Sequence, residues 1–513
     1  MTSPDAATPR PGRSPLERRQ ERTDDVTSVR AALRDPRRLR TEVLAGLVVA
    51  LALIPEAISF SIIAGVDPRV GLFASFTMAV SIAFLGGRPA MISAATGAVA
   101  LVIAPVVRDH GMDYLIATVI LAGLIQVVFG LLGVARLMRF IPRSVMVGFV
   151  NALAILIFLA QLPYLTGVSW YVYAMVAVGI ALIVLMPRLT KAVPGPLVAI
   201  VVLTGVTLAF GLSVPDVGDQ GELPDSLPSL FLPDVPLTWE TLQIIGPFAV
   251  GMALVGLMES LMTAKLVDDV TDTHSDKTRE AWGQGAANVI TGFFGGMGGC
   301  AMIGQTMINV KVSGARTRIS TFLAGVFLLV LVVGLGDVVG TIPMAALVAV
   351  MVMVSVATFD WHSIRPSTLR RMPKSETTVM LATVAVTVAT ENLAYGVLAG
   401  VLVAALMFVN RVAHFTEVVE VAHPDEDTRV YAVVGELLWA SSNDLIYQFD
   451  YTGDPANVVI DLSRSHIWDA STVATLDAIT RKYAEKGKTV TITGLNEASA
   501  ERHARLAGHL GGE

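Results

Sequence analysis

Long apolar runs separated by short polar stretches dominate residues 41–415. Two of them, residues 44–64 and 379–413, are long enough for a helix to cross a bilayer, which takes about 20 apolar residues. The pattern predicts roughly fourteen spans, some shorter than ideal. Of the 513 residues, 53% are hydrophobic and 16% are charged, and the mean hydropathy is +0.64. The chain is therefore predicted to be an α-helical polytopic membrane protein rather than a soluble one.

One apolar run is interrupted. Four glycines between residues 295 and 299 break it, and the run that starts at Ala301 is too short to cross a bilayer alone. Broken backbone at membrane depth costs several kcal/mol per free group unless protein buries it or it lines a wet cavity. A helix that begins at Ala301 directs free N–H groups and its positive dipole end at whatever lies there. Such a break near an ionisable residue, here Glu259, indicates a transporter site.

The first half of the chain carries a similar break. Phe84-Leu-Gly-Gly is followed by Ala90-Met-Ile, and Phe294-Gly-Gly is followed by Ala301-Met-Ile. The spacer differs by two residues, so chance similarity of apolar segments is the alternative. About seven spans per half, with the break in the third span of each, is the inverted-repeat pattern. The two half-helix N-termini are then expected to meet near the bilayer midplane.

Basic residues predict the orientation. Cytoplasmic loops are enriched in Lys and Arg, and Arg34, Arg37, Arg38 and Arg40 precede the first span. The loop at residues 211–243 has acidic residues and no Lys or Arg, so it is expected outside. The protein is predicted to lie in the inner (cytoplasmic) membrane of the cell, with both termini in the cytoplasm. The loops after even-numbered spans carry the other basic residues: Arg136, Arg139, Arg143, Arg188, Lys191, Lys265, Lys277, Arg279, Lys311, Arg316, Arg318, Arg365, Arg370, Arg371 and Lys374.

The two ends of the chain differ from the apolar middle. Residues 1–40 are polar and basic and are predicted to be a disordered tail up to about Asp35. Residues 416–513 are soluble in character, with strands expected at 430–439, 457–462 and 489–494 and helices at 470–486 and 499–506. Strands that alternate with helices predict a small α/β domain.

Several side chains near the breaks suit ion binding. Glu259 and Thr263 lie four residues apart, hence on one helix face, and their oxygens could ligate Na⁺. Glu259 alone could instead carry H⁺, or it could simply hydrogen-bond the broken backbone. An ionisable residue within a span costs about 2.5–3.5 kcal/mol on insertion scales, so it seldom persists without a role.

The candidate contacts to a substrate are polar groups of the same region. Glu56 follows Pro55, which tends to kink a helix. The Glu56 carboxylate either faces the substrate site or makes a structural hydrogen bond. Ser93 and Thr96 can donate hydroxyls to an anion, or can bond back to their own helix. Gln305 either contacts substrate or caps its helix.

Other residues limit the possible chemistry. Cys300 is the single cysteine, so no disulfide within the chain and no two-cysteine metal site can form, and it is expected to be a small buried residue. Asp268, Asp269 and Asp272 are expected in a solvated loop. The spans contain neither HExxH nor GxSxG, which argues against an enzyme. No cofactor and no nucleic-acid partner are predicted.

The chain resembles the SulP (sulfate permease) family, bacterial relatives of the animal solute-carrier-26 anion exchangers. The resemblance covers roughly residues 40–510 and is carried by ALALIPEAISFSIIAGVDPRVGL, GGRPAMISAATG, ESLMTAKLVDDVTDT and GQGAANVITGFFGG. The terminal VVIDLSRSHIWDAST is similar to a STAS domain. In related anti-sigma antagonists the segment matching Asp469-Ala-Ser471 carries a phosphorylated serine. Ser471 is therefore a candidate regulatory site, with helix capping by Asp469 as the alternative.

The resemblance implies a seven-plus-seven inverted repeat. Spans 1–4 and 8–11 would form a core domain, spans 5–7 and 12–14 a gate domain, and residues 416–513 the STAS domain, often in a homodimer. Thr96 matches an anion-contacting position, and Glu259 and Thr263 match residues that help bind Na⁺ in sodium-coupled bicarbonate members. Ala301, Met302 and Ile303 match the start of the second half-helix. Many members have an arginine where this chain has Gln305.

The expected function is secondary active transport of a small inorganic oxyanion through the lipid bilayer. Bicarbonate is the slightly preferred substrate over sulfate, because Glu259 and Thr263 match the sodium-coupled bicarbonate members. The expected mechanism is Na⁺- or H⁺-coupled symport by alternating access. The alternatives are a dicarboxylate transporter, an anion exchanger, a channel or voltage-driven motor of the same family, and a nucleobase–proton symporter of the same fold.

Overall fold

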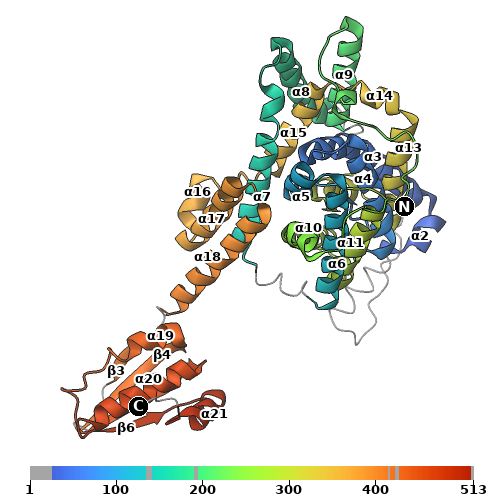
Figure 1. Cartoon of the computed structure of the whole chain (residues 1–513). Helices are drawn as coiled ribbons and strands as arrows, with labels where there is room; N and C mark the ends of the chain where they lie inside the picture. Colours follow the sequence, from blue (N-terminus) through green and yellow to red (C-terminus); the bar gives the residue numbers. More distant parts are fainter. Residues whose placement is uncertain (1–25, 134–140, 190–193, 414–415, 422–426, 510–513) are drawn as a thin grey trace, which may run out of the picture. The chain divides into compact units, whose positions relative to one another are not determined.

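The computed structural model describes residues 26–133, 141–189, 194–413, 416–421 and 427–509 (Figure 1). Packing contacts divide the chain into two units, Met1–Val401 and Leu402–Glu513. The predicted domain boundary at residue 415 and the expected loop residues Arg136, Arg139 and Lys191 lie outside the described residues. The division at Leu402 falls inside a helix whose last turns expose Leu402, Leu406 and Phe408.

The first unit is helical. Its first half contains α2 (Val29–Arg34), α3 (Pro36–Ala64), α4 (Pro68–Leu85), α5 (Gly97–His110), α6 (Met112–Leu131), α7 (Arg143–Leu159), α8 (Trp170–Leu189) and α9 (Gly195–Phe210). Its second half contains α10 (Trp239–Thr271), α11 (Lys277–Phe293), α12 (Ile303–Met307), the π-helical η4 (Ile308–Val312), α13 (Arg318–Gly334), α14 (Gly336–Gly340), α15 (Met344–Thr358), α16 (Pro366–Arg371) and α17 (Lys374–Thr390). Helix α18 (Leu393–Ala413) runs across the boundary between the units.

The helices confirm a polytopic membrane fold. Within the described residues, seven are long and apolar enough to cross a bilayer: α3, α4, α6, α7 with the turn after it, α8, α10 and α18. Helices α9, α13 and α15 are apolar but shorter. The count of fourteen crossings stays a prediction.

Both predicted breaks are present, and they meet. Strand β1 (Ser93–Ala94) leads into α5, and strand β2 (Cys300–Ala301) leads into α12. The two strands pair antiparallel, with Ser93 opposite Ala301 and Ala94 opposite Cys300. Two segments from opposite halves of the chain therefore share a small sheet inside the helical unit, as the inverted-repeat pattern predicted.

Packing contacts within this unit fall into two groups. Helices α3, α4, α5, α6, α10, α11 and α13 contact one another, and so do α7, α8, α9, α15 and α17. Small residues allow the closest approach: a side-chain carbon added at Gly285 of α11 would lie 2.5 Å from the Gly123 carbonyl oxygen of α6. Helices α3 and α15, α5 and α7, and α3 and α9 also contact each other across the two groups. The division into a core and a gate domain and the relative movement of the two domains stay predictions.

Part of the predicted disordered tail is helical. Ser28 caps α2 by accepting from the Ala31 N–H, and Asp35 caps α3 by accepting from the Arg37 N–H. The Arg38 guanidinium also donates to the Val26 carbonyl at 2.7 Å. These local caps order residues 29–40, which corrects the expectation for that stretch. Residues 1–25 lie outside the described part of the chain.

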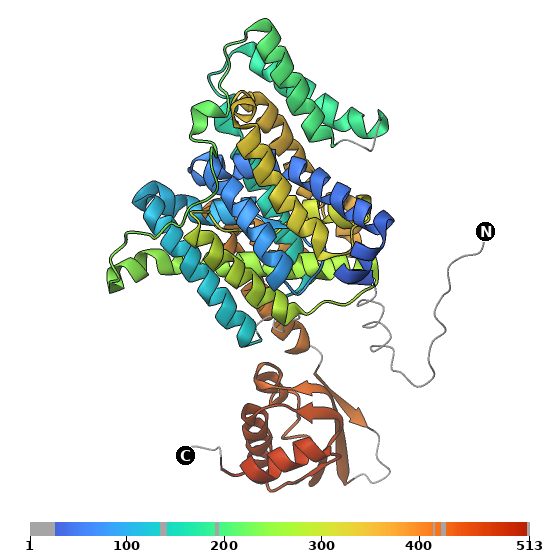
Figure 2. The same ribbon diagram turned by 90° about the vertical axis from the view of Figure 1, so that its right-hand side faces the viewer.

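The second unit is the small α/β domain that the STAS resemblance implies. Its sheet has the order β3 (Glu417–Val421), β4 (Thr428–Leu437), β5 (Asn457–Ile467) and β6 (Thr489–Thr493), with only the β3–β4 pair antiparallel. The predicted helices are α20 (Ala470–Ala484) and α21 (Glu497–Leu506), while β3 and α19 (Trp439–Leu445) were not predicted. Figure 2 shows the helices of this unit packed against its sheet, where Val433, Ile460 and Leu476 are buried.

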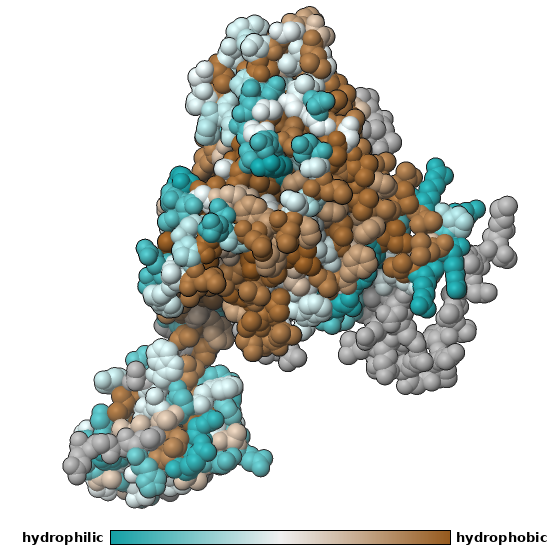
Figure 3. All heavy atoms as spheres, turned by 45° about the vertical axis from the view of Figure 1, so that its right-hand side comes forward, coloured by the Kyte–Doolittle hydropathy of each residue, from teal (hydrophilic) through white to brown (hydrophobic). Residues whose placement is uncertain are grey.

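The surfaces of the two units differ in character. Figure 3 shows apolar side chains over much of the visible face of the helical unit and mostly polar side chains on the α/β unit. Exposed apolar residues include Leu131, Val201, Leu208, Phe210 and Leu381. Water disfavours an apolar surface of this extent, whereas lipid tails accept it.

Candidate functional site

The centre of the site is a hydrogen-bonded chain of three buried side chains from three elements. Thr96 caps the N-terminus of α5, Cys300 lies in β2, and Glu259 lies in α10. The Thr96 Oγ1 atom lies 3.1 Å from the Cys300 Sγ atom, and the thiol donates to Glu259 Oε2 at 3.0 Å. Cys300 thus joins the start of one half-helix to the carboxylate, a contact that its expected role as a small buried residue did not include.

Thr263 and Ser260 bring α10 against β2. The Thr263 hydroxyl donates to the Glu259 carbonyl at 2.8 Å and lies 3.5 Å from the Ala301 carbonyl oxygen. The Ser260 hydroxyl accepts from the Ala301 N–H at 3.1 Å. Carboxylate, hydroxyl and carbonyl oxygens therefore gather beside β2. Oxygen ligands of this kind could hold Na⁺, and the carboxylate alone could hold a proton.

The first turn of α12 is open to a ligand. The N–H groups of Ala301 and Met302 are used by Ser260 and by the Ile92 carbonyl. Within the described residues, no side chain caps α12, and Gly304 is exposed with no neighbouring atom within 4 Å of where a side-chain carbon would stand. The residues that offer the backbone donors of this turn are therefore Ile303, Gly304 and Gln305, rather than Ala301 and Met302 as expected.

Glu56 and Gln305 are brought together. Glu56 in the middle of α3 lies beside the Gln305 side chain at the start of α12, and both are buried. The structure thus joins two residues for which the sequence left both a site role and a structural role open. Ser93, by contrast, is held by Gln284 of α11, whose amide donates to its hydroxyl at 2.6 Å.

A ladder of three buried polar residues on α11 holds both broken segments, and sequence reasoning missed it. Glu280, Gln284 and Asn288 are spaced four residues apart, so they lie on one face of the helix. Glu280 accepts from the Gly87 and Arg88 N–H groups at 2.8 and 2.9 Å, and its other oxygen accepts from Gln284. Asn288 makes two hydrogen bonds to the backbone of Gly299. The four-residue spacing of polar groups in an apolar run was the available signal.

The expectation that Asp268 belongs to a solvated loop is wrong. Asp268 lies in the last turns of α10, is buried, and pairs with Arg88 at 3.0 Å and Lys277 at 2.6 Å. Burial of Arg88 in the loop before β1 requires a counter-charge, and Asp268 supplies it. Asp269 is exposed, and Asp272 ends the helix in a left-handed conformation.

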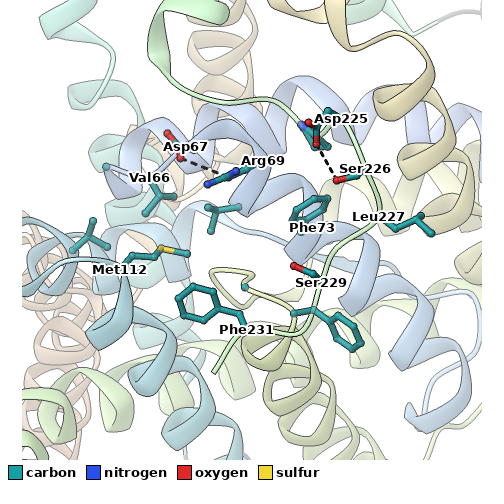
Figure 4. Close-up of a pocket in the computed structure, with 16 residues that line it drawn as sticks. Val66, Asp67, Arg69, Phe73, Met112, Asp225, Ser226, Leu227, Ser229 and Phe231 are labelled. Carbon is teal, nitrogen blue, oxygen red and sulfur yellow. Dashed lines mark hydrogen bonds and ion pairs between the residues drawn. The ribbon is translucent and has the colours of Figure 1, made fainter. Parts of the chain in front are cut away.

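A cavity of about 520 Å³ lies away from these residues (Figure 4). It is lined by the α3–α4 turn, the end of α5, the start of α6 and residues 224–231 of the long loop before α10. Arg69 forms ion pairs with Asp67 and Glu222 beside it, and Phe73 and Phe231 contribute apolar walls. None of the predicted site residues lines this cavity.

In the second unit, Ser471 is exposed in the first turn of α20. Asp469 caps that helix by accepting from the Thr472 N–H at 3.0 Å, so the capping alternative is realised. A phosphate on Ser471 stays a prediction.

The model of the sulfate permease family matches residues 39–178 and 169–383, more than half of the chain. The chain belongs to the sulfate permease family. The Bacillus subtilis protein named "Putative sulfate transporter YbaR" is 54% identical over 469 residues, which cover 91% of this chain and 97% of that protein. The bicarbonate transporter BicA of Synechocystis is 27% identical over 521 aligned positions, covering 92% of this chain and 91% of BicA.

Two solved structures have a fold similar to that of this chain. The transmembrane domain of a cyanobacterial BicA superposes with a TM-score of 0.63 at 26% identity, over 71% of this chain and 97% of that one. Murine Solute Carrier 26 family member A9 gives a TM-score of 0.76 at 16% identity, over 91% of this chain and 87% of that one, which shows a shared fold. The family consists of sulfate and bicarbonate anion transporters rather than enzymes, and this chain is a multi-pass membrane protein of it.

Proposed function

We propose that this chain is a secondary active transporter that moves bicarbonate or sulfate across the cytoplasmic membrane by alternating access, coupled to Na⁺ or H⁺. The observation that carries the proposal is the antiparallel pairing of β1 with β2. It places the starts of α5 and α12 together, next to the buried carboxylate of Glu259. The proposed substrate contacts are Thr96 and the first turn of α12, with Glu56 and Gln305 beside them.

The charge balance of this site supports symport. The starts of α5 and α12 supply roughly half a positive charge each. The candidate contacts Ser93, Thr96 and Gln305 are neutral, and the carboxylates of Glu56 and Glu259 both oppose an anion. A Na⁺ or H⁺ bound at Glu259 removes its part of that opposition, so that anion and cation bind better together than apart.

Two arguments bear on the choice of anion. YbaR, which carries a sulfate transporter name, is far more similar to this chain than BicA is. The site itself offers little positive charge, which suits the monoanion bicarbonate better than the dianion sulfate. Both anions therefore belong in the test.

Uptake by the purified protein in liposomes tests the proposal. Labelled bicarbonate and sulfate are supplied in separate assays, each with an imposed Na⁺ gradient, an imposed H⁺ gradient or neither. The proposal expects uptake of at least one anion, accelerated by one gradient, and loss of that acceleration in Glu259→Gln. Uptake that responds to neither gradient and needs internal anion would make the protein an exchanger, and ion current without coupling would make it a channel.

The cellular setting follows from the same proposal. The basic residues in α2 and at the start of α3, and the acidic loop before α10, support cytoplasmic termini in the inner membrane. A homodimer and regulation through Ser471 are further expectations that the family resemblance supports.

A further inference from the structure

We propose that the helical unit binds an anionic phospholipid at its predicted cytoplasmic end, with the lipid phosphate in a basic cavity and the acyl chains on the apolar surface beside that cavity. The cavity is separate from the candidate anion site. The inference goes beyond the proposed function and does not depend on which substrate the protein carries.

The cavity has a volume of about 680 Å³ and lies between α2, the loop after α4, the connection from α10 to α11, and the start of α13. Small-molecule sites have volumes of about 300–1,000 Å³. Among the described residues that line it, Lys277, Arg279 and Arg318 are cationic and Asp276 is the one carboxylate. Because basic pockets of this kind on the cytoplasmic side of a membrane protein bind lipid headgroups, the lining favours a phosphate.

Carbonyl groups, rather than carboxylates, hold two of these cations in place. The Arg279 guanidinium donates to the Phe84 and Leu85 carbonyls at 2.9 and 3.2 Å. The Arg318 guanidinium donates to the Gly86 carbonyl at 2.7 Å. In the part of the chain that the structure describes, neither guanidinium forms an ion pair. The end of α4 carries only about half a negative charge, so it positions both cations without neutralising them.

The charges in and around the lining leave one positive charge over. The Asp268 carboxylate is shared between Lys277 and Arg88, at 2.6 and 3.0 Å. A phosphodiester carries one negative charge and therefore balances the cluster, whereas a zwitterionic headgroup adds a cation of its own. With His274 counted as neutral, the cations of the lining and of the groups that bond or adjoin it are Arg88, Lys277, Arg279 and Arg318, and the carboxylates are Asp268, Asp276 and Glu280.

Apolar side chains continue from the cavity onto the exposed surface. Phe84, whose carbonyl binds Arg279, is 65% exposed, and its ring packs edge-to-face on that of Phe322 of α13 at 5.8 Å. On α2, Val29 lines the cavity, and Leu33, four residues later on the same face, is 58% exposed. Acyl chains would cover this apolar surface, and a free phosphate would not. The combination favours a phospholipid over a soluble anion.

Thr278 permits a substitution that changes the charge of the cavity while suiting the fold. It lines the cavity in the first turn of α11. A carboxylate in that turn interacts favourably with the positive end of the helix dipole, so Thr278→Glu should fold. Thr278→Glu cancels the surplus positive charge, and Thr278→Gln is the matched control of nearly equal size without the charge.

Native mass spectrometry of the full chain, titrated with phosphatidylglycerol or with phosphatidylcholine, tests the proposal. The wild type should bind one phosphatidylglycerol about fivefold or more tightly than phosphatidylcholine, since one charge pair near the surface is gained. Thr278→Glu should lose this preference and Thr278→Gln should keep it. Equal binding of the two lipids by the wild type, or equal affinities of the two variants for phosphatidylglycerol, overturns the proposal.

A second position makes the test independent of α11. Val29→Glu introduces the same charge into the cavity from α2 and should also lose the preference for phosphatidylglycerol, whereas Val29→Gln should retain it. Thermal unfolding in phosphatidylcholine micelles checks that each variant is folded. Retention of the wild-type preference by folded Val29→Glu counts against the proposal.

Two further measurements distinguish a lipid from a soluble phosphate. Inorganic phosphate should not displace phosphatidylglycerol, and displacement would assign the cavity to a soluble anion instead. Phe84→Ala should weaken the binding of phosphatidylglycerol about fivefold or more, because apolar contact with the acyl chains is lost. Phe210→Ala, at an exposed phenylalanine at the end of α9, is the matched control and should bind like the wild type. Wild-type affinity in Phe84→Ala overturns the placement of the acyl chains.

Discussion

Asn288 binds both backbone groups of Gly299, the residue that precedes β2. Its side-chain oxygen accepts from the Gly299 N–H at 2.8 Å, and its amide donates to the Gly299 carbonyl at 3.0 Å. The same amide donates to Gln126 of α6 at 2.9 Å. One side chain of α11 thus satisfies backbone that the broken span leaves without helical partners, which would otherwise cost several kcal/mol in lipid.

Asn288→Ala should lower the free energy of unfolding by about 2 kcal/mol, because buried groups of Gly299 and Gln126 lose their partners. The measurement is thermal unfolding of the purified protein in detergent. The exposed Asn457 of the α/β unit gives the matched control, and Asn457→Ala should leave the transition unchanged. Equal transitions for Asn288→Ala and the wild type would show that Asn288 does not hold the break.

Asp268→Ala should destabilise the protein by about 3–5 kcal/mol, because it leaves the buried guanidinium of Arg88 without its counter-charge. The neighbouring Asp269 is exposed, so Asp269→Ala should change the free energy of unfolding by less than about 0.5 kcal/mol. Denaturant or thermal unfolding of both variants measures the difference. Two aspartate variants of equal stability would refute the ion-pair account.

Chemical labelling of introduced cysteines tests the predicted orientation of the chain in the membrane. The native Cys300 is buried, so its background reaction with a bulky maleimide should be low. Asp225→Cys, exposed in the loop before α10, should react in intact cells with a maleimide that cannot cross membranes. Lys374→Cys, exposed at the start of α17, should react only after permeabilisation. The opposite labelling pattern would invert the topology.

The α/β unit should lose stability at alkaline pH. Burial and hydrogen bonds to the Asp454 carboxylate raise the pKa of Tyr431 to about 12, and the same causes raise the pKa of Tyr483. A tyrosine in the unfolded chain titrates near pH 10, so the folded unit holds these protons more tightly. The contribution of these two tyrosines to the free energy of unfolding is fully present below about pH 10 and is lost as the pH rises toward about 12.

The measurement is the free energy of unfolding of the α/β unit in the full chain at pH 9 and at pH 11.5, the two values chosen to bracket the tyrosine titration. The Tyr431→Phe, Tyr483→Phe double variant should lose less stability over this interval than the wild type does. An equal loss in both proteins would assign the alkaline transition to other groups.

The sequence predicted the breaks but not what holds them. The glycine-interrupted segments and the repeat between the two halves predicted that two half-helix starts meet, and the pairing of Ser93 with Ala301 came only from the structure. Glu280, Gln284 and Asn288 escaped prediction because each has at least one partner in a segment distant along the chain. Polar residues on a helix face also suit a solvated surface. Asp268 was misassigned for the same reason, since its partner Arg88 lies in the other half of the chain.

The central claim is that the starts of α5 and α12 form the anion site, and Thr96→Val in liposome uptake tests it most directly. Valine keeps the shape of the side chain and removes the hydroxyl. The account predicts a KM raised about tenfold or more, because a hydrogen bond to a charged substrate is lost. Thr118→Val is the matched control, since Thr118 is also buried and, within the part of the chain that the structure describes, its hydroxyl bonds only the Tyr114 carbonyl of its own helix. A wild-type KM in Thr96→Val, or an equal rise in Thr118→Val, would contradict the account.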